Sequence, residues 1–265
     1  MYWYRDLWTA VHGIGLLMAK GFVVVLGHAA GSLLSPPVAH AQIKPGEYVS
    51  DGGHGVLRIL TDKGDALRFQ LNMRGANFHV CELSGVIRSG ESRLVDDADP
   101  GLPCIVTFRP DKNGIAVNSK HEGACSAYCG ARAHFEGSYT LPPANCTPSH
   151  VRQMRDRFKT MYDKKLFTEA RVILAPIADK CSNWLTELDG AWVDNDLAIA
   201  HYRAGDAVAC RASLKQWLEL ARTPDKTIEG NYPPSDAAEM LRIAQAVRAN
   251  MKLCGAPVTV NTGGK

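Results

Sequence analysis

The chain has 265 residues, and its 30 Lys and Arg residues outnumber its 27 Asp and Glu residues by only three. So small an excess of positive charge, with no basic block, argues against a nucleic-acid-binding protein. The densest basic cluster comprises Arg152, Arg155, Arg157 and Lys159. Its spacing is that of a helix face, and we expect this face to be solvated.

The N-terminal segment has the order of regions found in a secretory signal peptide. Lys20 precedes an apolar run, Gly21 to Leu34, and Val38-Ala39-His40-Ala41 has the small residues of a cleavage site. The run has about 14 residues, fewer than the about 20 that a transmembrane helix needs. We therefore predict that residues 1–41 are a signal peptide, with Met18 as an alternative start. An uncleaved membrane anchor is the competing interpretation.

Residues 42–141 are predicted to form an antiparallel β domain. Short apolar stretches, several of them alternating, are separated by turn sequences such as Asp62-Lys63-Gly64-Asp65. Their spacing leaves no room for crossover helices, so we expect a meander that closes into a small barrel or a compact sandwich. A helical turn is expected at residues 124–130. The expected strands cover residues 56–60, 66–71, 78–83, 86–88, 93–95, 104–108, 115–117 and 135–139.

Residues 142–146 are predicted to be a linker, residues 147–254 an all-helical domain and residues 255–265 a flexible tail. Thr147-Pro148 is typical of an N-cap followed by proline at the first helical position. A second helix is predicted from Thr168 to about Leu188, and Pro176 should kink or split it. Further helices are expected to start near Asn195, near Asp206 and, with an N-cap, at Ser235.

The helical domain contains an internal repeat of 40 residues. At this shift Tyr162 aligns with Tyr202, Ala170 with Cys210, Arg171 with Arg211, Leu174 with Leu214 and Ile177 with Trp217. The matches predict two successive helical hairpins packed in the tetratricopeptide manner, with a turn at Gly205-Asp206. An ordinary helical bundle is the alternative. The chain is thus predicted to be an α+β protein with two domains, a β meander or small barrel followed by tetratricopeptide-like hairpins.

All the cysteines of the chain follow Ala41. An even number of Cys residues in an exported chain indicates disulfides rather than catalytic thiols, and we predict a periplasmic protein. The competing interpretation is a zinc site made by Cys125, Cys129, His121 and His134. The eight residues predicted to form disulfides are Cys81, Cys104, Cys125, Cys129, Cys146, Cys181, Cys210 and Cys254.

The predicted topology suggests how these cysteines pair, although eight of them allow 105 combinations. Cys81 and Cys104 lie in different strands and are expected to bridge them. Cys125 and Cys129 are expected to pair locally, across one helical turn. In the helical domain the expected pairs are Cys181 with Cys210, on neighbouring helices, and Cys146 with Cys254, at the two ends of the domain.

Two segments, residues 77–85 (Asn-Phe-His-Val-Cys-Glu-Leu-Ser-Gly) and residues 125–139, which begin with Cys-Ser-Ala-Tyr-Cys-Gly-Ala-Arg, resemble exported bacterial proteins related to lysozyme inhibitors. In that family a small β domain precedes a helical domain like residues 166–220, with an Asn-Asp-Leu-Ala stretch that matches Asn195 to Ala198. The resemblance covers nearly the whole mature chain. It implies a protein that inhibits a cell-wall-degrading enzyme.

Four residues are the predicted contacts with a partner. Asp51 and His54 lie in the loop Asp51-Gly52-Gly53-His54-Gly55, whose glycines allow close approach of the backbone to a target cleft. Arg132 is either a ligand for a carboxylate or a structural residue paired with Glu136. Trp184 is either a core residue or an aromatic anchor for a partner.

The mature sequence contains no Gly-x-Ser-x-Gly, His-Glu-x-x-His, Ser-x-x-Lys or phosphate-loop motif. We therefore predict a protein that is not an enzyme and that holds no cofactor and no metal. Its predicted partner is another protein, either a cell-wall hydrolase or a toxin effector, with no nucleic acid and no stable membrane insertion. The first hypothesis is an inhibitor or immunity protein that occludes a lysozyme-like enzyme, and the alternative is an envelope adaptor that binds a partner in its helical groove.

Overall fold

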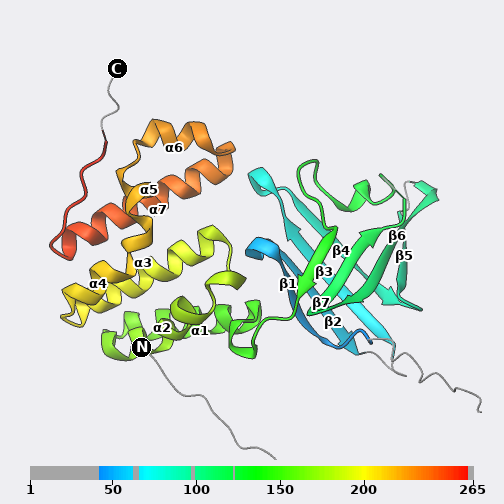
Figure 1. The fold of residues 1–265 in the computed structure, drawn as a ribbon, viewed down its shortest axis with the longest axis horizontal. Coiled ribbons are helices and arrows are strands. Elements are labelled where there is room, and N and C mark those ends of the chain that lie inside the picture. Colours follow the sequence, from blue (N-terminus) through cyan, green and yellow to red (C-terminus); the bar gives the residue numbers. More distant parts are fainter. Residues whose placement is uncertain (1–41, 62–65, 97–98, 122, 262–265) are drawn as a thin grey trace, which may run out of the picture. The chain divides into compact units, whose positions relative to one another are not determined.

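The computed structural model describes residues 42–61, 66–96, 99–121 and 123–261. They form a β domain followed by a helical domain, which confirms the predicted α+β organisation (Figure 1). The predicted signal peptide and the predicted turn at residues 62–65 lie outside these ranges.

The described part of the β domain contains eight strands in one antiparallel sheet. Each strand pairs with the next except β4 with β5, and β1 also pairs with β8, so the meander closes into a nearly complete barrel with the strand order β4-β3-β2-β1-β8-β7-β6-β5. The strands β4 and β5 meet at a tight hairpin, where Arg88 and Glu91 form a single bridge. The strands are β1 (Gly46–Ser50), β2 (Gly55–Thr61), β3 (Leu67–Arg74), β4 (Val80–Ile87), β5 (Glu91–Asp96), β6 (Asp99–Asp111), β7 (Gly114–Ser119) and β8 (Gly137–Thr140).

Alternate residues of the strands fill the interior of the barrel, as the period of two predicts. Leu57 and Ile59 on β2 are buried in this way, and the rings of Phe69 and Phe108 lie 4.8 Å apart. Each such side chain contributes about 1.5–3 kcal/mol to the free energy of unfolding. The barrel therefore has its own apolar core.

Two disulfides fix the segment between β7 and β8 to the rest of the barrel. They join Cys81 to Cys129 and Cys104 to Cys125, so the predicted pairs Cys81–Cys104 and Cys125–Cys129 are wrong. The expected helical turn is a 3-10 helix, η4 (Ser126–Tyr128). Because Cys125 and Cys129 lie on either side of this turn, each reaches a different strand. The zinc hypothesis is excluded, since both of these sulfurs are in disulfides.

The helical domain has seven α-helices in the described residues. The second predicted helix ends early, at Lys180, without splitting at Pro176, and the next begins at Glu187 rather than near Asn195. None of the helices is long and apolar enough to cross a bilayer, within the described ranges. The helices are α1 (Pro148–Asp163), α2 (Phe167–Lys180), α3 (Glu187–Arg203), α4 (Ala207–Ser213), α5 (Leu218–Arg222), α6 (Asp225–Asn231) and α7 (Pro234–Leu253).

The 40-residue repeat corresponds to two hairpins with equivalent turns. The turn of the first hairpin joins α1 to α2, and there the amides of Lys165 and Leu166 donate to the carbonyls of Tyr162 and Met161. The turn from α3 to α4 has the same bonds 40 residues later, from the amide of Gly205 to the carbonyl of Tyr202 and from the amide of Asp206 to the carbonyl of His201. The repeat is thus present in the backbone, while its tetratricopeptide character stays a prediction.

The two disulfides of the helical domain join Cys146 to Cys181 and Cys210 to Cys254. The predicted pairs Cys181–Cys210 and Cys146–Cys254 are wrong because the helices alternate in direction. Cys181 ends α2 and returns to the start of α1, whereas Cys210 lies at the opposite end of the hairpins, where α7 also ends. All the described cysteines are paired, as predicted.

The described part of the predicted tail packs on the helical domain. Ala256 and Val258 contact its core, and the Asn261 amide donates to the Arg222 carbonyl at 2.7 Å. The predicted linker likewise contains a 3-10 turn, η5 (Ala144–Cys146), in which Cys146 is buried.

Side chains of the barrel cap two helices of the other domain. The carboxylate of Glu47 accepts from the amide of Ser149, at 2.9 Å, in the first turn of α1. Burial alone would raise the pKa of Glu47, but hydrogen bonds from Ser149 and the Arg58 guanidinium bring it below its ordinary value. The negative charge is retained, and it also suits the positive end of the helix dipole.

Asn77 makes a reciprocal cap with α7. Its side-chain oxygen accepts from the Ser235 amide at 3.0 Å, and its own amide donates to the Asp236 carboxylate at 2.8 Å. This has the logic of a capping box, although the capping residue comes from a distant part of the chain. Ser235 therefore lies in the first turn of the helix and is not the N-cap that the sequence suggested. These caps direct the N-termini of α1 and α7 at the barrel.

Candidate binding groove

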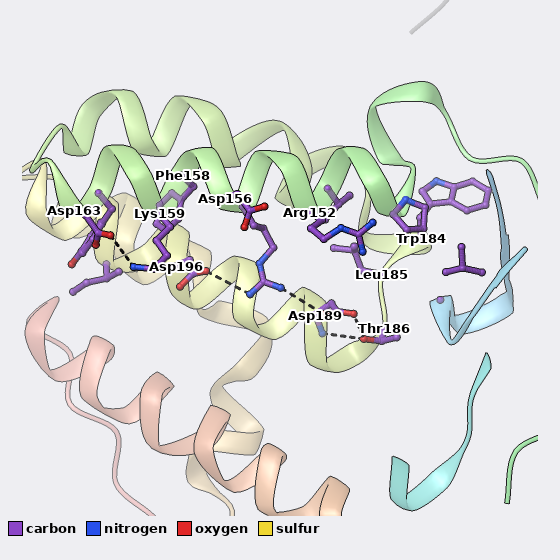
Figure 2. Close-up of a pocket in the computed structure, with 17 residues that line it drawn as sticks. Arg152, Asp156, Phe158, Lys159, Asp163, Trp184, Leu185, Thr186, Asp189 and Asp196 are labelled. Carbon is purple, nitrogen blue, oxygen red and sulfur yellow. Dashed lines mark hydrogen bonds and ion pairs between the residues drawn. The ribbon is translucent and has the colours of Figure 1, made fainter. Parts of the chain in front are cut away.

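A groove of about 700 Å³ lies between α1 and α3, and Figure 2 shows the side chains that line it. The helix α2 packs against both α1 and α3, so these two first helices of the hairpins form opposite walls. The strand β2 closes one end through Val56. The groove therefore has two helical walls and a barrel end.

The wall formed by α1 is a continuous stripe at helical spacing. Val151 and Phe158 form its buried base, and Tyr162 lies half-buried at the far end. The cations Arg152, Arg155 and Lys159 occupy positions i, i+3 and i+7, which lie on one side of a helix. Part of the basic cluster that the sequence suggested would be solvated thus lines a cavity.

The wall formed by α3 is acidic. The guanidinium of Arg155 reaches across the groove to Asp189 at 3.6 Å and to Asp196 at 3.8 Å (Figure 2). Lys159 makes a shorter pair, 2.8 Å, with Asp163 on its own helix. Arg155 therefore bridges the two hairpins through loose ion pairs.

Asp196 is the most perturbed carboxyl of the groove. Burial raises its pKa to about 6, and the nearby Arg155 charge offsets only part of this effect. The other charged groups that line the groove are Arg152, Arg155, Lys159, Asp156 and Asp163 on α1 and Asp189 on α3. Near neutral pH a modest change in proton concentration therefore alters the charge of this wall.

The barrel end of the groove is more apolar. Trp184 and Leu185 are half-buried there, together with Val56 and the backbone of Gly53. Gly53 has φ +76°, and a Cβ atom on it would lie 2.6 Å from the Leu185 carbonyl carbon. Only glycine fits this position, so the Asp51–Gly55 loop is packed on the segment before α3 and does not project freely.

The structure separates the four predicted contact residues into two hollows. Asp51, His54 and Arg132 line a second cavity of about 490 Å³ between the barrel and the helices α3 and α7. Trp184 lines the α1–α3 groove instead. The suggested partner of Arg132, Glu136, accepts a hydrogen bond from Ser119 at 2.9 Å. Three of the four residues thus lie together, although Arg132 is distant in the sequence from the loop that holds Asp51 and His54.

Sequence reasoning missed Arg155, Asp189 and Asp196 as groove residues. A signal for the cationic wall was present in the spacing of the basic residues. No comparable signal marked the acidic wall, because the side of α3 that lines the groove depends on the residue at which α3 begins. The described residues contain no cluster of His, Cys, Asp and Glu that could hold a metal ion.

The comparisons with known proteins add no assignment. No family model matches the sequence, and no curated protein or solved structure is significantly similar to it. Inference about function therefore starts from the groove itself.

Proposed function

We propose that the protein is a non-enzymatic binding protein that holds a segment of a protein partner in the α1–α3 groove. The observation that carries the proposal is the uncovered face of α1, which presents apolar and charged side chains to the groove. The helix has 16 residues and is therefore about 24 Å long. An extended segment of about seven residues fits this length.

Two features of the protein suit such a role. The Cys146–Cys181 disulfide joins the start of α1 to the end of α2, and Glu47 of the barrel caps α1, so little conformational entropy of this wall is lost on association. The charged groups of the groove are engaged mainly with one another, an arrangement that favours recognition over chemistry. The disulfides also indicate an oxidising compartment, for which we propose the periplasm.

The resemblance to proteins related to lysozyme inhibitors supports a cell-wall-degrading enzyme as the partner. The protein then acts as an inhibitor or immunity protein that occludes this enzyme. An adaptor that carries an envelope protein in the same groove is the second candidate. The packed state of the Asp51–Gly55 loop favours the groove over this loop as the contact surface in either case.

The test compares the groove with the loop. Purified oxidised protein is mixed with lysozyme-type hydrolases, and binding is followed by calorimetry and inhibition by cell-wall clearing. Ile199 of α3 also lines the groove. We expect Trp184→Ala and Ile199→Arg to weaken binding, and the paired change Asp51→Ala and His54→Ala to leave it unchanged. Val172→Ala, at an exposed position of α2, is the control.

Three results would change the proposal. Loss of binding only in the Asp51→Ala and His54→Ala protein would move the site to the loop. Binding without inhibition would favour the adaptor. Turnover of a cell-wall substrate by the protein alone would contradict a non-enzymatic role.

A further inference from the structure

The placement of cations in the groove points to the chemistry of its occupant. We propose that the groove takes an acidic segment, whose carboxylates bind Arg152 and Arg155 while its apolar side chains contact Trp184 and Leu185. This inference rests on the proposed function and specifies the partner.

Arg152 is the available cation of the row. Lys159 pairs with Asp163, and Arg155 with the two aspartates of α3. In the described part of the chain, no carboxylate lies within ion-pair distance of Arg152. Its side chain is exposed at the end of the groove that also holds Trp184 (Figure 2). An anionic group beside an apolar contact is therefore complementary to this end.

The two ion pairs of Arg155 are weak enough for a ligand to replace them. Its pairs of 3.6 and 3.8 Å are longer than the 2.7–2.9 Å of a direct charge-assisted hydrogen bond. Its side chain is 33% exposed, and those of Asp189 and Asp196 are 47% and 35% exposed, so these pairs are weak. A direct hydrogen bond from Arg155 to a partner carboxylate therefore stabilises the complex by more than the loss of the two loose pairs destabilises it. In the absence of a ligand, Asp189 and Asp196 thus make the ion pairs with Arg155 that the carboxylates of a ligand would replace.

A basic segment fits the groove less well. It would lie against Arg152, while the aspartates of α3 are already paired with Arg155 and Asp163 is paired with Lys159. Asp156 is the one remaining acidic group among the described lining residues, in which four carboxylates and three cations line the groove. The preference for an acidic occupant therefore comes from the end of the groove that holds Arg152, and not from the charge of the whole lining.

Asp196 also makes the affinity dependent on pH. Its pKa of about 6 means that it loses its charge as the pH falls through that value. The other charged groups that face it are Arg155 and Lys159 on α1 and Asp189 on α3. Glutamates of a ligand keep their charge in this range. Arg155 then has one competitor fewer. We therefore expect the affinity for an acidic segment to increase as the pH falls from about 7.5 to about 5.5.

The experiment uses two pools of eight-residue peptides with the same apolar residues, and with Glu or Lys at the remaining positions. Affinity for the full oxidised protein is measured by fluorescence anisotropy at pH 7.5 and pH 5.5. We expect the acidic pool to bind more tightly, and Arg152→Gln to weaken it about tenfold, as for the loss of one charged hydrogen bond. Asp196→Asn should tighten binding at pH 7.5 and remove the pH dependence.

Arg157→Gln is the matched control, because Arg157 lies on the same helix but does not line the groove. An equal effect of Arg157→Gln and Arg152→Gln would overturn the inference, since it would indicate general charge attraction. Preference for the basic pool would also overturn it, but would leave the proposed function standing. Failure of both pools to bind would contradict the proposed function as well.

Discussion

The two helical hairpins have the same backbone turn but differ in what covers their first helices. The helix α3 packs against α2, α4 and α7, whereas α1 has α2 as its main helical neighbour. As a result α3 buries even polar residues, Asp194 and Asn195, while α1 keeps a stripe that faces the groove. A repeat thus leaves a groove-lining surface uncovered where its neighbour is missing on one side.

The hairpins also differ in their second helices. The helix α2 continues to Lys180, but its counterpart is interrupted after Ser213 by a 3-10 turn, η7 (Lys215–Trp217), before α5 begins. At the interruption the Trp217 indole donates to the Asp194 carboxylate at 2.8 Å, and the Gln216 amide donates to the same oxygen. The first hairpin has Met154 at the position of Asp194. One buried carboxylate therefore accompanies the break.

The largest effect is expected where the hairpins are most alike. Leu174 and Leu214 are equivalent in the repeat, and both are fully buried. We expect Leu174→Ala and Leu214→Ala each to lower the free energy of unfolding by about 2–5 kcal/mol. Urea unfolding of the oxidised proteins measures both. A cost below about 1 kcal/mol at either position would show that the two hairpins do not share this packing.

A smaller effect is expected at the interruption of the second hairpin. Asp194→Ala leaves the Trp217 and Gln216 donors without their acceptor, which should lower the free energy of unfolding by about 1–3 kcal/mol. The control is Asp179→Ala, at an exposed position of α2, which should change it by less than about 0.5 kcal/mol. Chemical denaturation monitored by tryptophan fluorescence measures both. Equal stability of the two variants would contradict a role for Asp194 in holding η7.

Equivalent positions in the turns of the two hairpins carry different residues, Lys165 and Gly205, and each can be replaced. Lys165 has φ +61° and its counterpart Gly205 has φ +85°, so glycine is better suited to both positions. We expect Gly205→Ala to cost about 1 kcal/mol, and Lys165→Gly to gain less than about 1 kcal/mol. Thermal unfolding compares the two variants with the original chain. Shifts of the same sign would mean that the turns are not equivalent.

The smallest effect concerns the acidic wall. Burial raises the pKa of Asp196 to about 6 in the folded protein, so its ionisation costs stability. The contribution is most favourable below the unfolded pKa, near 4, and is lost as the pH rises through 6. We expect the free energy of unfolding of the original chain, minus that of Asp196→Asn, to fall as the pH rises from 4.5 to 7.5. The fall should be less than about 1 kcal/mol, because Asp196 is partly exposed. Urea titrations at several pH values test this, and a rise over the same interval would contradict it.

The sequence predicted most of the strands and the repeat because both depend on local periodicity, although the strands expected at residues 78–83 and 86–88 form one strand, β4. The predictions from the sequence were wrong where a contact depends on which ends of the helices and strands lie together in the fold. The pairing of Cys181 with Cys146, for example, follows from α2 running back to the start of α1. The strand β1 was missed because only its last residues are buried in its short span. The helix α6 was also not predicted.

The candidate site was predictable only in part. The cationic stripe of α1 and Trp184 were visible in the sequence, but their common groove required the position of α3. The gathering of Asp51, His54 and Arg132 around one cavity likewise depends on the barrel closing and on its contact with α3 and α7. The caps from Glu47 and Asn77 join residues far apart in the chain. No local pattern encodes such contacts.

The central claim is that the uncovered face of α1, opposite α3, is the binding surface. The most direct measurement is the change of backbone amide NMR shifts when the tightest-binding acidic peptide of the pool is added to the oxidised protein. The account predicts that the shifted amides cluster in residues 152–163 and 189–199, with little change in α2 or α4. Shifts centred on the barrel, or on the outer faces of α2 and α4, would contradict it.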